Sequence, residues 1–108
     1  MENVTIVLLN NNGGSIFNRL PVAQLEPPFT ELFLTPPNLD FEPVVRMYGL
    51  DYQLATCRDE FRAMFAKSVQ DNTPRVIEVR TDNKEDDARR REVNRWVVGE
   101  LSDWVIWP

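Results

Sequence analysis

The chain has 108 residues, which is enough for one small domain and too short for two. Its net charge of −5 disfavours nucleic acid as a partner, because nucleic-acid binding depends on Lys and Arg meeting phosphates. The sequence has no histidine and one cysteine, which excludes His-dependent catalysis, His–metal sites and any disulfide within the chain. No apolar run approaches the length of a membrane span and the N-terminus lacks a signal pattern, so we expect a cytoplasmic protein.

The first predicted element is a strand over residues 4–9. Its sequence, VTIVLL, is rich in β-branched residues and almost continuously apolar. This pattern is typical of an interior strand that is buried on both faces of a parallel sheet. An interior strand so close to an N-terminus is unusual, so we expect that something upstream has been cut away or never belonged to this chain.

The strand leads into a loop with the sequence Asn10-Asn11-Asn12-Gly13-Gly14, whose residue types tolerate positive φ. In open α/β sheets, ligands bind beyond the carboxyl ends of the strands. An asparagine there offers a neutral oxygen to a hard cation, and glycines let the backbone approach a phosphate closely. The loop suits a Mg²⁺–diphosphate group if a carboxylate comes from elsewhere, although a plain Asn-Gly turn has the same composition.

The rest of the chain alternates between helical and extended patterns. Residues 15–20 predict a short helix, and a proline-rich loop is expected over residues 21–39. The alternation predicts an α/β fold, with a parallel sheet flanked by helices and right-handed crossovers. Further helices are expected at 40–49, 56–69 and 82–105, with strands at 52–54 and 76–79.

Residues 8–17 (LLNNNGGSIF), followed by Leu20 and Pro21, resemble the second half of the thiamine-diphosphate motif. More narrowly, they resemble the 2-succinyl-5-enolpyruvyl-6-hydroxy-3-cyclohexene-1-carboxylate synthase family of menaquinone and phylloquinone biosynthesis. Residues 33–41 (FLTPPNLDF) and 74–79 (PRVIEV) also resemble that family's C-terminal region. The resemblance spans nearly the whole chain. It implies that residues 1–108 are the C-terminal portion of a diphosphate-binding domain.

In that family, Mg²⁺ is held by an aspartate of a Gly-Asp motif, by the second asparagine of the pair and by the carbonyl two residues later. Carried over, the last two ligands are the side chain of Asn11 and the backbone oxygen of Gly13. The resemblance thus implies thiamine diphosphate and Mg²⁺ as cofactors, with Mn²⁺ as a possible substitute. It implies that the cofactor-binding residues are Asn11, Asn12, Gly13, Gly14, Ser15, Ile16 and Phe17.

The same family lines its substrate pocket, near the thiazolium, with an Ile-Phe pair and a following Leu. These correspond to Ile16, Phe17 and Leu20. Without the resemblance, three apolar side chains of this kind would be interpreted as core residues. Ser15 stands where the family often has glycine, which is a departure beside the expected metal ligands.

The resemblance implies a transferase that decarboxylates 2-oxoglutarate and adds the succinyl unit to isochorismate, with the cofactor supplying the difficult chemistry. This chain contains no Gly-Asp motif, and the glutamate that activates the cofactor and the substrate-binding basic residues are also missing. We therefore expect no catalytic residue here and an inactive isolated chain. Its partners would be the missing upstream domains and, in the full-length enzyme, further copies in a dimer or tetramer.

Two alternative functions remain open from the sequence. The parent could be another thiamine-diphosphate enzyme, such as a 2-oxoacid decarboxylase or an acetolactate synthase. Alternatively, the chain could be a stand-alone domain that keeps the fold but serves only for binding or assembly.

Three other features favour structural interpretations. Cys57 shares a predicted helix face with Phe61, so we expect it to be buried. The arginines at 89–91 each follow an acid at 85–87 by four residues, which indicates a solvated helix face. The last helix carries an apolar stripe, expected to pack in a core except where its partner layers are missing. The stripe consists of Val93, Trp96, Val97, Leu101, Trp104 and Val105.

Overall fold

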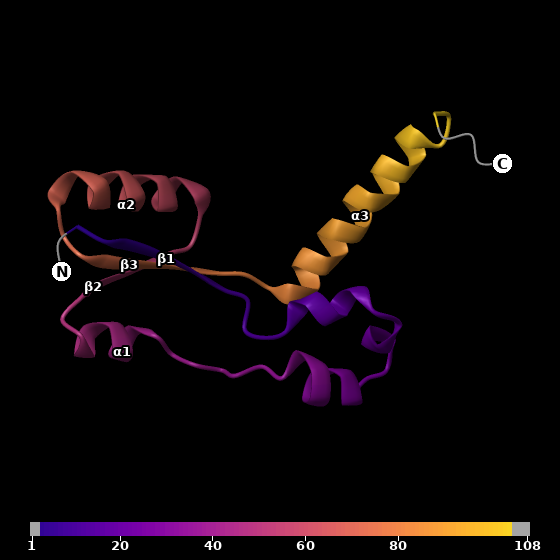
Figure 1. The fold of residues 1–108 in the computed structure, drawn as a ribbon, viewed down its shortest axis with the longest axis horizontal. Coiled ribbons are helices and arrows are strands. Elements are labelled where there is room, and N and C mark those ends of the chain that lie inside the picture. Colours follow the sequence, from indigo (N-terminus) through magenta and orange to yellow (C-terminus); the bar gives the residue numbers. More distant parts are fainter. Residues whose placement is uncertain (1–2, 105–108) are drawn as a thin grey trace. The chain divides into compact units, whose positions relative to one another are not determined.

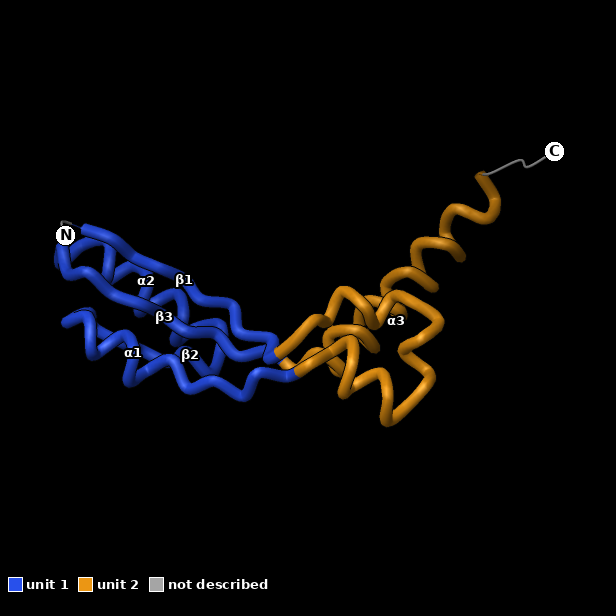
Figure 2. Tube along the Cα trace, turned by 60° about the horizontal axis from the view of Figure 1, so that its bottom comes forward, with its two compact units in different colours: residues 1–12, 36–81 blue, residues 13–35, 82–108 orange. Residues whose placement is uncertain are grey.

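The computed structural model describes residues 3–104. The described residues divide into two compact units (Figure 2): unit 1 contains residues 3–12 and 36–81, and unit 2 contains residues 13–35 and 82–104. That the whole chain is a single domain stays a prediction. The elements are β1 (Thr5–Asn10), η1 (Ser15–Arg19), η2 (Pro21–Gln24), η3 (Thr30–Leu34), α1 (Glu42–Met47), β2 (Asp51–Ala55), α2 (Arg58–Asp71), β3 (Arg75–Arg80) and α3 (Asn83–Leu101).

Unit 1 is built on a parallel sheet with the strand order β1-β3-β2. From β1 the chain crosses to β2 at the far side of the sheet, and from β2 it returns to β3 in the centre. Right-handed crossovers that run in opposite directions place their helices on opposite faces. Figure 1 shows α2 on one face and α1 on the other. The predicted fold class is confirmed: an α/β fold with a parallel sheet flanked by helices.

The position of β1 differs from the expectation of an interior strand. Among the described strands, β1 pairs only with β3, and its apolar side chains Ile6, Val7 and Leu9 are exposed. The centre is β3, where Ile77 and Glu78 are fully buried. An apolar run indicates that a strand tends to bury both of its faces, but it does not indicate which strands or helices are present to cover those faces.

The ends of the helices follow local chemistry. Gly49, with φ +73°, directly follows Tyr48, the C-cap of α1, in the left-handed conformation that commonly ends a helix. Asp82 caps α3 by accepting hydrogen bonds from the backbone N–H groups of Lys84 and Glu85, both at 2.9 Å. A cap of this type stabilises a helix by about 1 kcal/mol.

The start of α2 differs from the prediction. The helix expected from residue 56 begins at Arg58, with Cys57 as its N-cap. Thr56 donates to Glu60, from its backbone N at 2.9 Å and from its Oγ1 at 2.7 Å. Cys57 is exposed, so the expectation of a buried cysteine is wrong. At the N-cap its backbone is extended, and a residue there does not share the helix's apolar face.

Unit 2 packs a small cluster of aromatic rings. Phe29 is buried and stacks on Phe33 with ring centroids 6.2 Å apart, and Phe33 meets Phe17 edge-on at 5.8 Å. The apolar stripe of α3 is exposed from Val93 to Leu101 rather than packed in a core of the described residues, and Trp104, in the turn after the helix, is exposed as well. Its last predicted member, Val105, lies outside the described residues.

None of the helices in the described part of the chain combines the length and the apolar character that crossing a membrane requires.

Candidate functional site

The Asn-Gly loop begins where β1 ends, at Asn10. The backbone carbonyl of Asn10 accepts a hydrogen bond from the N–H of Thr81 at 2.9 Å, which continues the ladder between β1 and β3. Its side chain is bound at both ends: Nδ2 donates to Oε2 of Glu78 at 3.1 Å, and Oδ1 accepts from the backbone N of Asn12 at 3.0 Å. Asn10 therefore connects the central strand to the loop.

Glu78 holds a buried carboxylate next to this loop. Its Oε1 accepts from the hydroxyl of Tyr52 at 2.7 Å, and its Oε2 accepts from Nε of Arg80 at 2.8 Å as well as from Asn10. Burial alone raises the pKa of the Glu78 carboxyl, but the hydrogen bonds from Tyr52, Arg80 and Asn10 outweigh it and lower that pKa below its ordinary value. The group is therefore an ionised carboxylate at neutral pH.

Sequence reasoning missed Glu78 as a candidate functional residue. The signal that could have found it was a charged residue in the middle of the apolar strand 76–79, because an ionisable group is seldom fully buried without partners.

Asn12 has a second fixed contact, with Asn38. Asn12 Nδ2 donates to Asn38 Oδ1 at 2.9 Å, and Asn38 N donates to Asn12 Oδ1 at 2.9 Å. Both residues have positive φ, +55° and +51°. The predicted cofactor residue Asn12 therefore already has partners for both polar atoms of its side chain. The predicted metal ligand Asn11 lies beside it and is half-buried.

Gly13 and Gly14 lie where no larger residue fits. A Cβ on Gly13 would lie 2.6 Å from the carbonyl oxygen of Leu34, and one on Gly14 would lie 2.8 Å from that of Phe33. This close approach lets Gly14 N donate to Leu34 O at 2.8 Å. The carbonyl of Gly13, the second predicted metal ligand, accepts from the N–H of Ser15 at 2.9 Å, and a carbonyl oxygen has a further lone pair.

The predicted pocket residues lie on and just after η1. Ile16 is 67% exposed, Leu20 48% and Phe17 37%, so none of the three is a core residue within the described structure. Three large apolar side chains are thus presented next to the glycine loop, where another surface or a ligand can cover them.

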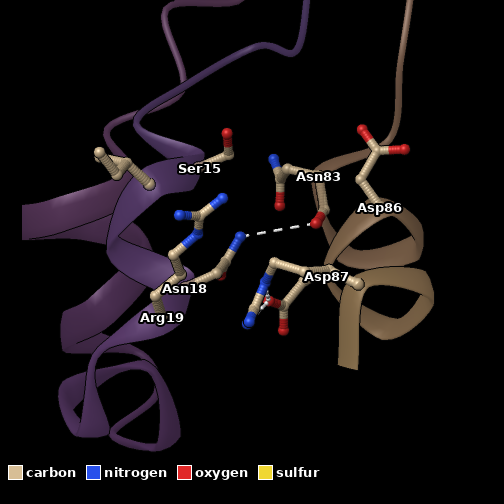
Figure 3. Close-up of a pocket in the computed structure, with 8 residues that line it drawn as sticks. Ser15, Asn18, Arg19, Asn83, Asp86 and Asp87 are labelled. Atoms are coloured by element: carbon tan, nitrogen blue, oxygen red, sulfur yellow. Dashed lines mark hydrogen bonds and ion pairs between the residues drawn. The ribbon is translucent and has the colours of Figure 1, made fainter. Parts of the chain in front are cut away.

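A cavity of about 480 Å³ lies within unit 2, between η1 and the first turns of α3 (Figure 3). Two predicted cofactor residues, Ser15 and Ile16, line it. The buried side chain of Asn18 spans it, because Asn18 Nδ2 donates to the carbonyl oxygen of Asn83 at 3.5 Å. The other lining residues are Arg19, Asp86, Asp87 and Arg90.

Two of the charged residues that line this cavity, Asp87 and Arg90, pair with each other on α3. Asp87 forms ion pairs with Arg90 at 2.6 Å and with Arg91 at 2.9 Å. The pair with Arg91 has the predicted i,i+4 spacing, whereas Arg90 pairs with the acid three residues before it.

A second cavity, of about 640 Å³, lies in unit 1 at the carboxyl ends of the three strands. Leu9, Leu54 and Val79 line it from the strands, and Cys57 and Phe61 line it from the first turns of α2. None of the residues that the resemblance assigned to the cofactor or the substrate lines this cavity.

The described residues contain no group of three or more Asp, Glu, Cys or His side chains that could hold a metal. A metal at the loop would therefore depend on amide and carbonyl oxygens from this chain and on ligands from outside it.

No family model matches the chain. It is 48% identical, over 92 residues, to a 2-succinyl-5-enolpyruvyl-6-hydroxy-3-cyclohexene-1-carboxylate synthase from Roseiflexus sp. strain RS-1. It is 43% identical over 95 residues to the enzyme of that name from Halobacterium salinarum, and 39% identical over 102 residues to the one from Trichodesmium erythraeum. These matches cover 85%, 88% and 94% of this chain. The chain belongs to this synthase family. It spans about 16% of the length of each of these relatives.

Proposed function

We propose that residues 1–108 are the C-terminal portion of the diphosphate-binding domain of a thiamine-diphosphate- and Mg²⁺-dependent synthase. The parent enzyme decarboxylates 2-oxoglutarate and adds the succinyl unit to isochorismate, in menaquinone or phylloquinone biosynthesis. The observation that carries the proposal is the start of the Asn-Gly loop at the carboxyl end of β1, where ligands bind in parallel α/β sheets. The shared name of the relatives supports it.

The residues of the loop fit a hydrated Mg²⁺ that carries a diphosphate. The amide oxygen of Asn11 and the carbonyl of Gly13 are hard, neutral ligands of the kind that Mg²⁺ accepts beside waters and phosphate oxygens. Because a Cβ at Gly13 or Gly14 would clash with a neighbouring carbonyl oxygen, these two positions carry no side chain, and the backbone of the loop is left bare there. When bound, thiamine diphosphate stabilises the carbanion that decarboxylation leaves.

This chain contributes binding and orientation. Asn11 and Gly13 hold the metal and, through it, the diphosphate, with Asn12, Gly14 and Ser15 completing the loop around it. Ile16, Phe17 and Leu20 form an apolar wall that excludes water from the reacting centre, because their exposed side chains become covered once substrate is bound. Mn²⁺ can replace Mg²⁺ in such an oxygen-rich site.

The isolated chain is inactive in this proposal. The third metal ligand, the glutamate that activates the cofactor and the basic residues that bind the substrates come from upstream domains of the same polypeptide. The assembled enzyme is a cytoplasmic homodimer or homotetramer.

Decarboxylation of 2-oxoglutarate tests the proposal. The full-length parent should release CO₂ from 2-oxoglutarate only when both thiamine diphosphate and Mg²⁺ are present, and the purified 108-residue chain should release none. A parent that decarboxylates pyruvate but not 2-oxoglutarate would belong to a different branch of these enzymes. Activity of the isolated chain would contradict the split of the site between two segments.

A further inference from the structure

Glu78 is a fully buried charge with no part in the proposed chemistry. Replacing a buried ionic group and its partners with well-packed apolar residues is often neutral or even stabilising. Fold stability alone therefore gives little reason for a carboxylate at the centre of β3.

The orientation of one amide gives a better reason. Oε2 of Glu78 lies 3.1 Å from Nδ2 of Asn10, and an ionised carboxylate can only accept hydrogen bonds. The amide of Asn10 must therefore face Glu78 with its nitrogen, which turns its oxygen toward the loop. That oxygen accepts the backbone N–H of Asn12 at 3.0 Å and closes a turn around Asn11.

The other contacts of Glu78 keep the carboxylate in place. The hydroxyl of Tyr52, on the neighbouring strand β2, binds it at 2.7 Å, and Nε of Arg80, two residues further along β3, binds it at 2.8 Å. A chain of hydrogen bonds thus runs from the central strand through Asn10 to the backbone of Asn12.

We propose that Glu78 is a positioning residue for the Mg²⁺–diphosphate loop: its carboxylate sets the orientation of the Asn10 amide and thereby the turn that presents Asn11. This inference rests on the proposed function. Glu78 itself touches neither metal nor cofactor in this account.

The test measures thiamine-diphosphate affinity as a function of Mg²⁺ concentration in the full-length parent. Glu78→Gln keeps the volume of the side chain, but its amide can present either end to Asn10, so the orientation is no longer dictated. We expect the affinity to fall about tenfold and the Mg²⁺ requirement to rise, at the low end of the range for groups that orient metal ligands.

The double variant tests whether Glu78 acts through Asn10. Asn10→Ala should weaken cofactor binding by a similar factor, and adding Glu78→Gln to it should cause no further loss. Losses that multiply would mean that the two residues act independently and would overturn the inference.

Asp51→Asn is the matched control. Asp51 binds the buried Arg75 at 2.6 Å at the amino ends of β2 and β3, so this change also deprives a buried ionic group of a charged partner, far along the strand from the loop. It should lower the melting temperature and leave the cofactor affinity and its Mg²⁺ dependence unchanged.

Asn10→Asp covers the case in which Glu78→Gln does not fold, because it alters no residue of β3. It keeps an acceptor for Asn12 but removes the donor that faces Glu78, and we expect a similar loss. If the wild-type parent shows no Mg²⁺-dependent cofactor binding, the proposed function fails. A different outcome would refute only the positioning role. In that case the wild type binds the cofactor and Asn11→Ala weakens binding, while the affinities of Glu78→Gln and Asn10→Asp stay within about twofold of the wild-type affinity.

Discussion

Asn12 and Asn38 are paired by two hydrogen bonds of 2.9 Å, one from the side-chain nitrogen of Asn12 to Asn38 Oδ1 and one from the backbone N of Asn38 to Asn12 Oδ1. Both polar atoms of the Asn12 amide are therefore occupied by the chain itself. Asn12 Oδ1, which accepts from the backbone N of Asn38, keeps one further lone pair. The pairing with Asn38 holds the Asn12 amide in one orientation.

The backbone of Asn38 gives a first prediction. Its φ of +51° lies in the left-handed region, where alanine has a conformational energy about 1–2 kcal/mol higher than in its ordinary conformations and glycine has no such penalty. Asn38→Ala and Asn38→Gly both remove the acceptor for Asn12, but only the alanine adds backbone strain. We expect the free energy of unfolding, measured by urea denaturation, to be lower for the alanine variant by about 1 kcal/mol. Equal values would show that the left-handed backbone is not required there.

The packing of Gly14 gives a second prediction. Its φ of −78° suits any residue, so the effect of Gly14→Ala is steric: the new Cβ would lie 2.8 Å from Phe33 O and 3.1 Å from the ring of Phe17. We expect a loss of about 1–3 kcal/mol in the free energy of unfolding, measured by urea denaturation.

Gly99→Ala is the control for this substitution. Gly99 lies within α3, and a methyl group added there would meet no atom within 4 Å, so alanine should stabilise the chain by up to about 1 kcal/mol. If both substitutions changed the stability equally, the close approach at Gly14 would be refuted.

Tyr52 gives a prediction about pH. Burial, the hydrogen bond to Glu78 and the charge of Glu78 raise the pKa of Tyr52 to about 12, from an ordinary value of 10.0. The folded state thus favours the neutral phenol. Its stabilisation is complete below about pH 10 and is lost as the pH rises toward 12, by on the order of 2–3 kcal/mol in total.

Urea unfolding between about pH 9 and pH 12 measures this effect. Tyr52→Phe should remove much of the alkaline loss of stability, and Tyr48→Phe, at the exposed second tyrosine, should preserve it. An identical pH dependence in wild type and Tyr52→Phe would contradict the coupling between Tyr52 and Glu78.

The strands and their parallel arrangement were predictable from the sequence because they depend on local patterns. The apolar run after Val4 and the run from Val76 to Val79 indicated buried strands, and the helices between them required parallel pairing. The edge position of β1 was not predictable, because strand order depends on where each crossover returns. Cys57 was misplaced because a shift of the helix start by one residue moves a side chain off the apolar face.

The site was predictable only in part. The motif predicts a site over the residues from Asn11 to Phe17, and the structure gives physical reasons for its two glycines. The partners of Asn10 and Asn12, which are Glu78 and Asn38, lie 68 and 26 residues away in the sequence. Contacts of that kind depend on strand register and loop closure, which no local pattern encodes.

A cofactor titration of Asn11→Ala and Asn12→Ala in the full-length parent, at fixed Mg²⁺, tests the central claim most directly. Asn11→Ala should weaken thiamine-diphosphate binding at least tenfold, or about 1.4 kcal/mol, because a water can replace the lost oxygen but cannot fix the metal against the diphosphate. Asn12→Ala should cause a clearly smaller loss, since its side chain is held by Asn38. Equal affinities, or a larger loss for Asn12→Ala, would contradict the account. The motif would then be placed one residue out of register, and the roles of Gly13, Ile16 and Phe17 would have to be reassigned.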